Sequence, residues 1–230
     1  MQIILGGGCF WCLQGCFDLL PFVNSVICGY SGGLVSNPTY EQVCSGKTGH
    51  AEVILIDYKE NSTNNIAKAE KKSEEKNLQN VDNSQNKNQN SVANSVANSV
   101  ANSVANSVAN SSENSSKNDS NLDKILNLFW QIHDPTTLNR QGADVGSQYA
   151  SVIFWETWDQ LEIIKQNLEK LEKSGKYSDQ IVTRIEEKAT FWQAEKKHQN
   201  YFENNPSERY CQLVILPKIQ KTKQILNANN

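Results

Sequence analysis

The sequence predicts a single domain of mixed helices and strands that a long low-complexity insertion interrupts. In residues 1–60 and 123–217, apolar runs of strand length alternate with apolar residues at helical spacing. Residues 61–122 contain no aromatic residue, glycine, proline or cysteine, and they are rich in Asn and Ser. Without them about 170 residues remain, which is a usual size for one domain.

The first stretch combines short apolar strands with two helices. Asn37-Pro38 is typical of a helix start, because Asn caps free N–H groups and Pro has none to lose, and Gly46 would end that helix. The predicted elements are a strand at 2–5, a helix at 13–20, a strand at 22–28, a short helix at 37–46 and a strand at 50–58.

The second stretch begins where apolar residues resume at helical spacing. Thr157 and Gln160 form a capping-box pattern at the start of a later helix. The predicted elements are a helix at 122–130, a loop at 136–147, a strand at 149–155, a helix at 158–171, a strand at 181–185, a helix at 191–202 and a polar tail at 218–230.

The insertion contains five copies of Asn-Ser-Val-Ala between Asn90 and Ala109. A four-residue period drifts around a helix of 3.6 residues per turn, so the valines form no stable stripe. Too few large apolar groups are present to offset the entropy of ordering, and we expect residues 61–122 to be a disordered surface insertion. A fold tolerates such a loop because closure entropy grows slowly with loop length.

Charge and composition argue against a nucleic-acid-binding, membrane or secreted protein. A formal net charge of −3 argues against a nucleic-acid-binding protein, whose footprint would be basic. The sequence contains no apolar stretch long enough to span a membrane and no visible secretory signal, so we expect a cytoplasmic protein without a membrane partner. In that compartment, six cysteines indicate catalysis, redox chemistry or metal binding rather than a disulfide framework.

Cys9 is the strongest candidate for a reactive residue. It follows three glycines and precedes an apolar helical run, so it should lie where a strand turns into a helix N-terminus. Free N–H groups and the helix dipole at that position favour a thiolate. Phe10 and Trp11 add two large apolar surfaces next to the sulfur, and Cys12 adds a second thiol. The alternative interpretation is a buried structural cysteine followed by core aromatics.

Three kinds of cysteine chemistry compete. In thiol redox catalysis, Cys9 attacks and a second thiol closes a disulfide with it. A metal or iron–sulfur site would use the C-x2-C-x3-C spacing of Cys9, Cys12 and Cys16, which matches no ferredoxin pattern and lacks an obvious fourth ligand. We therefore expect no metal. A papain-like hydrolase would pair Cys9 with His133 or His198, without local sequence support.

A binding module without catalysis is the fourth possibility. Trp11, Tyr30 and Tyr40 would then form an aromatic pocket for a methylated ligand. Such a module does not need a thiolate, so a loss of function on Cys9→Ser would argue against it.

Several spaced motifs resemble the type A methionine sulfoxide reductases. The similarity covers nearly all of the chain outside residues 61–122 and the last dozen or so. The motifs are Gly-Cys-Phe-Trp at 8–11, Gly-Tyr-Ser-Gly-Gly at 29–33, Asn-Pro-Thr-Tyr at 37–40, Val-Cys-Ser-Gly at 43–46, Gly-His-Ala-Glu at 49–52, His-Asp-Pro-Thr-Thr-Leu-Asn-Arg-Gln-Gly at 133–142, Asp-Val-Gly-Ser-Gln-Tyr at 144–149, Ala-Glu at 194–195 and His-Gln at 198–199.

The resemblance implies an α+β fold, with a mixed sheet, flanking helices and a long coiled C-terminal segment. It implies reduction of the S epimer of methionine sulfoxide, free or in proteins, by an enzyme that repairs oxidative damage. No cofactor is implied, because thioredoxin or another dithiol supplies the electrons. We expect a monomer.

The resemblance also implies the site residues. The Cys9 thiolate would attack the sulfoxide sulfur, and Phe10 and Trp11 would hold the substrate methyl group. Cys211 matches the resolving cysteine that closes a disulfide with oxidised Cys9. The remaining matches are Glu52, Tyr40 and Tyr149, which would bind and protonate the sulfoxide oxygen, and Asp144, which lies in the same site.

Two features of this chain qualify those roles. Cys12 stands where many members have glycine, one helical turn after Cys9, and it competes with Cys211 as the resolving thiol. Glu52 lies near the start of an apolar strand, where desolvation would raise its pKa and suit it to act as an acid. The alternative is an exposed carboxylate at a strand edge.

Overall fold

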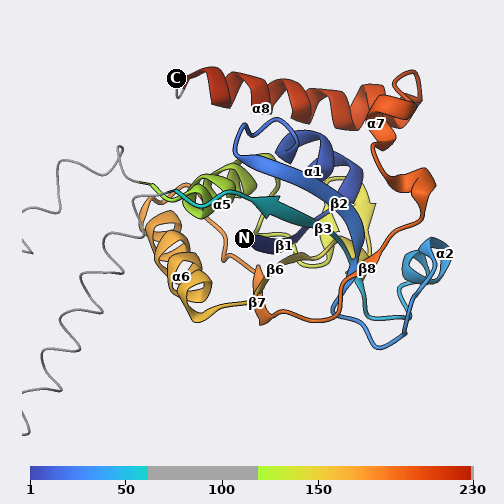
Figure 1. Ribbon diagram of the computed structural model, residues 1–230, viewed down its shortest axis with the longest axis horizontal. Coiled ribbons are helices and arrows are strands. Elements are labelled where there is room, and N and C mark those ends of the chain that lie inside the picture. Colours follow the sequence, from blue (N-terminus) through green and yellow to red (C-terminus); the bar gives the residue numbers. More distant parts are fainter. Residues whose placement is uncertain (62–118, 229–230) are drawn as a thin grey trace, which may run out of the picture. The chain divides into compact units, whose positions relative to one another are not determined.

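A computed structural model describes residues 1–61 and 119–228 (Figure 1). Residues Met1–Lys59 and Asn121–Asn230 form one unit, and Glu60–Ser120 fall outside it. Our interpretation of 61–122 as a disordered insertion therefore lies almost entirely outside the described residues. In the part of the chain that the structure describes, no helix combines the length and apolar character needed to cross a bilayer.

The unit is built on a six-stranded sheet with the order β7-β6-β1-β3-β2-β8. Every neighbouring pair is antiparallel except β6 with β7, which run parallel. The strands are β1 (Gln2–Gly7), β2 (Val23–Ser31), β3 (Ala51–Tyr58), β6 (Ser151–Trp155), β7 (Arg184–Glu187) and β8 (Trp192–Gln193). Helices flank this mixed sheet, which confirms the predicted α+β class (Figure 1).

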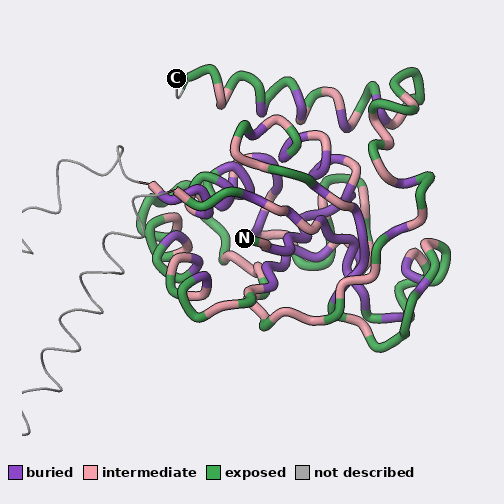
Figure 2. The backbone as a smooth tube through the Cα atoms, in the orientation of Figure 1, coloured by how far each residue is buried: buried purple, intermediate pink, exposed green. Residues whose placement is uncertain are grey.

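The central strands are buried on both faces, which explains their nearly continuous apolar sequences. Ile3 and Leu5 of β1 belong to the larger core cluster, whereas Ile4 between them belongs to a smaller cluster on the other face. The larger cluster includes residues of α1 (Phe10–Phe17), α5 (Asn121–Ile132) and α8 (Leu216–Ala228). Phe191 packs against the smaller one. Figure 2 shows buried residues concentrated along the sheet and α1.

Local sequence signals fix the helix ends. Thr39 caps α2 (Tyr40–Cys44) and Thr157 caps α6 (Trp158–Lys173), each in a complete capping box with the Gln three residues later. In α5 one face is apolar, and Leu122, Ile125, Leu126 and Phe129 are all buried. These helices confirm the predicted ones to within a few residues.

The predicted helix at 191–202 is wrong. The chain there forms β8, a 3-10 turn at Lys196–His198 and the short α7 (Tyr201–Asn204). The Ala194 N–H donates to the Cys28 carbonyl at 2.9 Å, and the Gln199 side chain bonds both the N–H and the carbonyl of Cys28. This pairing with the edge of β2 offsets the helical pattern, because tertiary contacts override local propensity.

The last described residues of the chain are helical. A π-helical turn at Cys211–Ile215 leads directly into α8. The sequence analysis assigns residues 218–230 to a polar tail, and most of these side chains are indeed polar. Ile215 and Ile219 nevertheless lie four residues apart and are buried, and a Cβ added at Gly15 of α1 would lie 2.9 Å from Ile219. This close packing holds α8 on α1.

Candidate active site

Cys9 lies at the junction of β1 and α1, as the sequence predicts. It is the N-cap residue of α1, and its carbonyl accepts hydrogen bonds from the N–H groups of Cys12 at 3.1 Å and Leu13 at 3.4 Å. Its side chain is only 5% exposed. Gly8 has a φ of +94°, and a Cβ there would lie 2.6 Å from the Gln141 side chain. Glycine therefore lets the β4 (Arg140–Gln141) hairpin approach the cysteine turn.

Glu52 is a buried carboxyl group aimed at the same turn. It is 1% exposed, and its Oε2 accepts a hydrogen bond from the Phe10 N–H at 3.2 Å. Its Oε1 has no hydrogen-bond partner among the described residues. Burial raises the pKa of Glu52 well above 4.5, and the charge of Cys9 raises it further. The exposed-carboxylate alternative is therefore wrong: burial favours the protonated form of Glu52, and its Oε1 has no partner among the described residues.

Aromatic rings form the wall next to Cys9. Phe10 is fully buried, and its ring lies 5.8 Å from that of Trp11 and 6.2 Å from that of Tyr40. Tyr201 stacks on Trp11 with ring centroids 3.8 Å apart. His198 lies 4.3 Å from the Tyr40 ring and 5.6 Å from the Trp11 ring. The structure thus brings together Phe10, Trp11 and Tyr40, three of the aromatic residues that the sequence predicts for the site.

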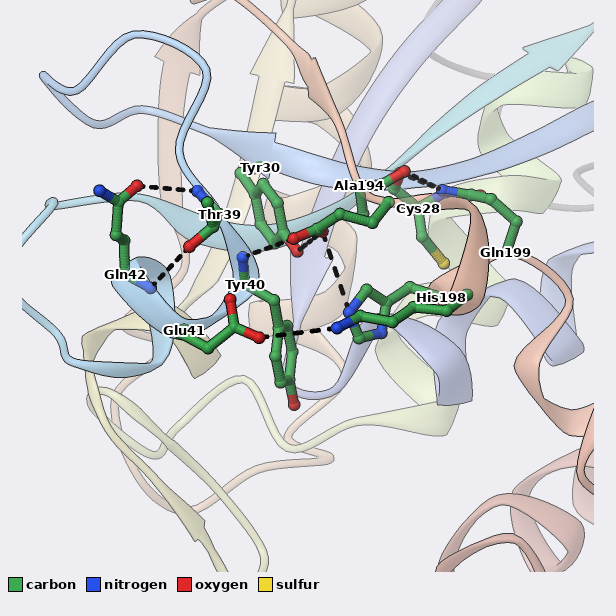
Figure 3. A network of polar contacts seen from close by, with 11 residues as sticks. Cys28, Tyr30, Thr39, Tyr40, Glu41, Gln42, Ala194, His198 and Gln199 are labelled. Carbon is green, nitrogen blue, oxygen red and sulfur yellow. Dashed lines mark hydrogen bonds and ion pairs between the residues drawn. The ribbon is translucent and has the colours of Figure 1, made fainter.

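Glu195 holds this wall in place. Its carboxylate accepts hydrogen bonds from the Tyr30 hydroxyl and the Tyr40 N–H, each at 2.9 Å (Figure 3). His198 Nε2 lies 3.9 Å from the same carboxylate. Burial lowers the pKa of His198, so its ring is a neutral member of the wall. Glu195 and His198 lie in the motifs Ala194-Glu195 and His198-Gln199, but no sequence signal predicted a role for Glu195.

Two further predicted site residues come from a segment that follows α5 in the chain. Asp144 lies in β5 (Asp144–Val145), and Tyr149 lies in the 3-10 turn at Ser147–Tyr149. Burial and the charge of Glu52 raise the pKa of Tyr149. Asp144 accepts a hydrogen bond from the Tyr210 hydroxyl at 2.9 Å. Tyr210 is a site residue that the sequence analysis missed, although it directly precedes Cys211.

The whole-chain comparisons agree with this geometry. The sequence model described as "Peptide methionine sulfoxide reductase" matches residues 1–102 and 114–230. The chain belongs to the peptide methionine sulfoxide reductase family. It is 36% identical to the MsrA of Natronomonas pharaonis over 96% of this chain and 92% of that protein. It is also 36% identical to the MsrA of Nautilia profundicola over 99% and 97% of the two chains.

Solved structures show the same fold. Reduced Mxr1 from Saccharomyces cerevisiae aligns with a TM-score of 0.60 at 24% identity, over 92% of this chain and 88% of that one. Methionine sulfoxide reductase A of Corynebacterium diphtheriae aligns with a TM-score of 0.56 at 23% identity, over 90% and 76%. The family model and the MsrA relatives, rather than the fold, show that this chain is a methionine sulfoxide reductase that repairs oxidised methionine. The hydrolase and binding-module alternatives are wrong for that reason.

All six cysteines of the reductase lie in the described part of the chain, and each is a free thiol. Cys12 is buried one turn after Cys9, and Cys211 is buried at the first position of the π-helical turn. Cys28 donates its S–H to the Phe10 carbonyl and to Gln14 Oε1, which suits a structural role. In residues 1–61 and 119–228, no three His, Cys, Asp or Glu side chains converge as metal ligands.

The first two thiols of the reductase are coupled. Burial raises the pKa of the Cys9 thiol well above its ordinary value, and a hydrogen bond with Cys12 raises it further. The same hydrogen bond, together with the charge of Lys218, lowers the pKa of Cys12. The prediction of a stabilised Cys9 thiolate omitted this burial, which opposes the helix N-terminus. The two sulfur atoms titrate as a pair.

Proposed function

We propose that the enzyme reduces the S epimer of methionine sulfoxide, free or in proteins, with Cys9 as nucleophile and Glu52 as general acid. The observation that carries this proposal is the position of the Glu52 carboxyl group, which is buried next to the Cys9 turn with Oε1 unpaired among the described residues. Burial there raises its pKa. A sulfoxide oxygen gains basicity while a thiolate attacks its sulfur, so a positioned acid accelerates that step. Tyr40 and Tyr149 are hydroxyl donors for the same oxygen.

In the first step, the Cys9 sulfur forms a bond to the sulfoxide sulfur while the oxygen takes a proton from Glu52. The hydroxyl group then moves from the substrate sulfur to the Cys9 sulfur as the bond between the two sulfur atoms breaks. This step releases methionine and leaves Cys9 as a sulfenic acid. The sulfoxide has gained two electrons, and Cys9 has lost two. Phe10 and Trp11 hold the methyl group of the substrate, which the apolar wall supports. Asp144 faces the same space and binds the polar part of the substrate.

In the second step, a second thiol attacks the Cys9 sulfenic acid, a disulfide forms and water leaves. Cys211 is our first candidate for this thiol, and Cys12 is the competing one because it is already hydrogen-bonded to Cys9. A thioredoxin dithiol then reduces the disulfide by thiol–disulfide exchange. Six free thiols suit a reducing compartment, and we place the enzyme in the cytoplasm as a monomer.

The test is to incubate the enzyme with the separate S and R epimers of methionine sulfoxide and dithiothreitol. We expect methionine from the S epimer alone, and none from either epimer with Cys9→Ser. Equal product from both epimers would contradict the stereochemistry, and product from Cys9→Ser would remove Cys9 from the mechanism. A matched Cys16→Ser variant, which changes a buried thiol of α1 that the mechanism does not use, should retain activity.

A further inference from the structure

Tyr210 contacts three residues of the proposed site from the segment that carries Cys211. Its hydroxyl donates to Asp144 Oδ2 at 2.9 Å, and its ring lies edge-on to Trp11 with centroids 5.9 Å apart. The hydroxyl also acts on the Cys9 sulfur, because it lowers the pKa of that thiol. Tyr210 therefore interacts with three parts of the site: the nucleophile Cys9, the aromatic wall at Trp11 and the polar residue Asp144.

We propose that Tyr210 is a latch, whose hydroxyl holds the Cys211 segment (residues 205–215) on the active site until a bound sulfoxide displaces it. The inference rests on the proposed function, because it concerns how the second thiol gains access to oxidised Cys9. Tyr210 acts here as a positioning residue for the second step.

The contacts of the segment favour such a latch. Residues 206–209 are all exposed, and Tyr210 is the first side chain after them that packs into the site. Cys211 follows directly and is fully buried. The turn at Cys211–Ile215 is π-helical, a conformation that is rare and is frequently found at functional sites. Cys211 also packs in the larger core cluster, and the Gln212 N–H donates to the Glu208 carbonyl, so loss of the Tyr210 contacts loosens the segment rather than freeing it.

The chemistry explains how substrate would open the latch. The Tyr210 hydroxyl donates to Asp144, and its interaction with the Cys9 sulfur lowers the pKa of that thiol. A sulfoxide that brings its sulfur to Cys9 competes for that same sulfur atom. A polar group of the substrate that binds Asp144 would compete for the second contact. The contacts with Cys9 and with Asp144 both belong to the Tyr210 hydroxyl. Binding of the substrate would therefore release the Cys211 segment.

The first test measures how fast N-ethylmaleimide alkylates Cys211, followed by peptide mass spectrometry. In Tyr210→Phe, which keeps the ring and removes the hydroxyl, we expect Cys211 to react about tenfold faster than in the wild type. The matched control is Tyr177→Phe, which removes a hydroxyl bonded to the Trp130 carbonyl far from the thiols and should leave the rate unchanged. Equal rates in Tyr210→Phe and the wild type would overturn the latch.

The second test asks whether substrate opens the latch. Glu52→Gln is expected to turn over slowly, so the S epimer can occupy its site while Cys211 is alkylated. We expect faster labelling of Cys211 with the S epimer than with the R epimer, and no such difference in the double variant Glu52→Gln/Tyr210→Phe. Equal labelling with both epimers in Glu52→Gln would overturn the coupling to substrate. The first test uses no sulfoxide, so its result stands even if the S epimer yields no methionine and the proposed function fails.

Discussion

Glu52 Oε2 accepts a hydrogen bond from the backbone N–H of Phe10 at 3.2 Å, and this bond ties the acid to the turn that carries Cys9. The contact joins β3 to the N-terminus of α1 across 42 residues of sequence. It leaves Oε1 directed to no protein donor among the described residues. The position of the carboxyl group is therefore fixed by the backbone, while its second oxygen stays available for a substrate.

Replacing Glu52 with glutamine should lower the rate of sulfoxide reduction by about 10²- to 10⁴-fold, because a positioned general acid contributes on that order. The glutamine oxygen can still accept from the Phe10 N–H, so the fold should be retained. The measurement is methionine formation from the S epimer in a single turnover, with a thermal unfolding curve as control. An unchanged rate would remove Glu52 from the mechanism.

The same residue predicts how stability depends on pH. Burial raises the pKa of Glu52 above 4.5 in the folded protein, so the folded state holds a proton that the unfolded chain releases. Its contribution to stability is full below pH 4.5 and is lost as the pH rises toward the folded pKa. Relative to Glu52→Gln, the wild type should therefore become less stable as the pH rises from 4.5. Urea unfolding of both proteins at several pH values tests this, and a constant difference would refute the shift.

Two serine variants separate the candidate resolving thiols. With Cys211→Ser, we expect about one methionine per enzyme and then a stall when thioredoxin is the reductant, because oxidised Cys9 lacks its partner. With Cys12→Ser, recycling by thioredoxin should continue. The measurement is methionine formed per enzyme against time, with the disulfide mapped by mass spectrometry.

A stall in Cys12→Ser with continued recycling in Cys211→Ser would instead assign disulfide formation with Cys9 to Cys12. The interaction between Cys9 and Cys12 makes this a specific alternative, since it raises the pKa of Cys9 and lowers that of Cys12. Sustained turnover in Cys211→Ser, together with a Cys9–Cys12 disulfide, would decide it. Cys16→Ser is a suitable control, because Cys16 is fully buried and the mechanism does not use it.

The parts of the fold that the sequence predicts well are those with a repeated local pattern. The apolar run of β1, the capping box of α6 and the apolar face of α5 each specify their element without distant contacts. The error at 191–202 arose because Gln199 and Ala194 bond to Cys28, about 170 residues earlier. No local pattern encodes such a contact.

In the site too, residues with a local sequence signal could be predicted and residues that act through distant contacts could not. Cys9 could be predicted from its neighbours, because a glycine run before a helix start is a local signal. The roles of Glu52 and Asp144 required the resemblance, since isolated carboxylates carry no local signal. Tyr210 and Glu195 were missed because each acts through a partner distant in sequence, Asp144 and Tyr30 respectively. The raised pKa of Cys9 depends on burial, which appears only when the fold closes over it.

Removing residues 62–118 and joining the ends with a short Gly-Ser linker should leave the activity within about twofold of the full chain. The described ends already lie together, because Asn121 Nδ2 donates to the Lys59 carbonyl at 2.6 Å and Asn61 Nδ2 donates to the Asp119 carbonyl at 3.0 Å. A short linker therefore closes without distorting β3 or α5, and loop length contributes little to stability. The measurements are turnover of the S epimer and the free energy of unfolding. A deletion protein that fails to fold would show that the removed residues support the domain, contrary to their interpretation as an insertion.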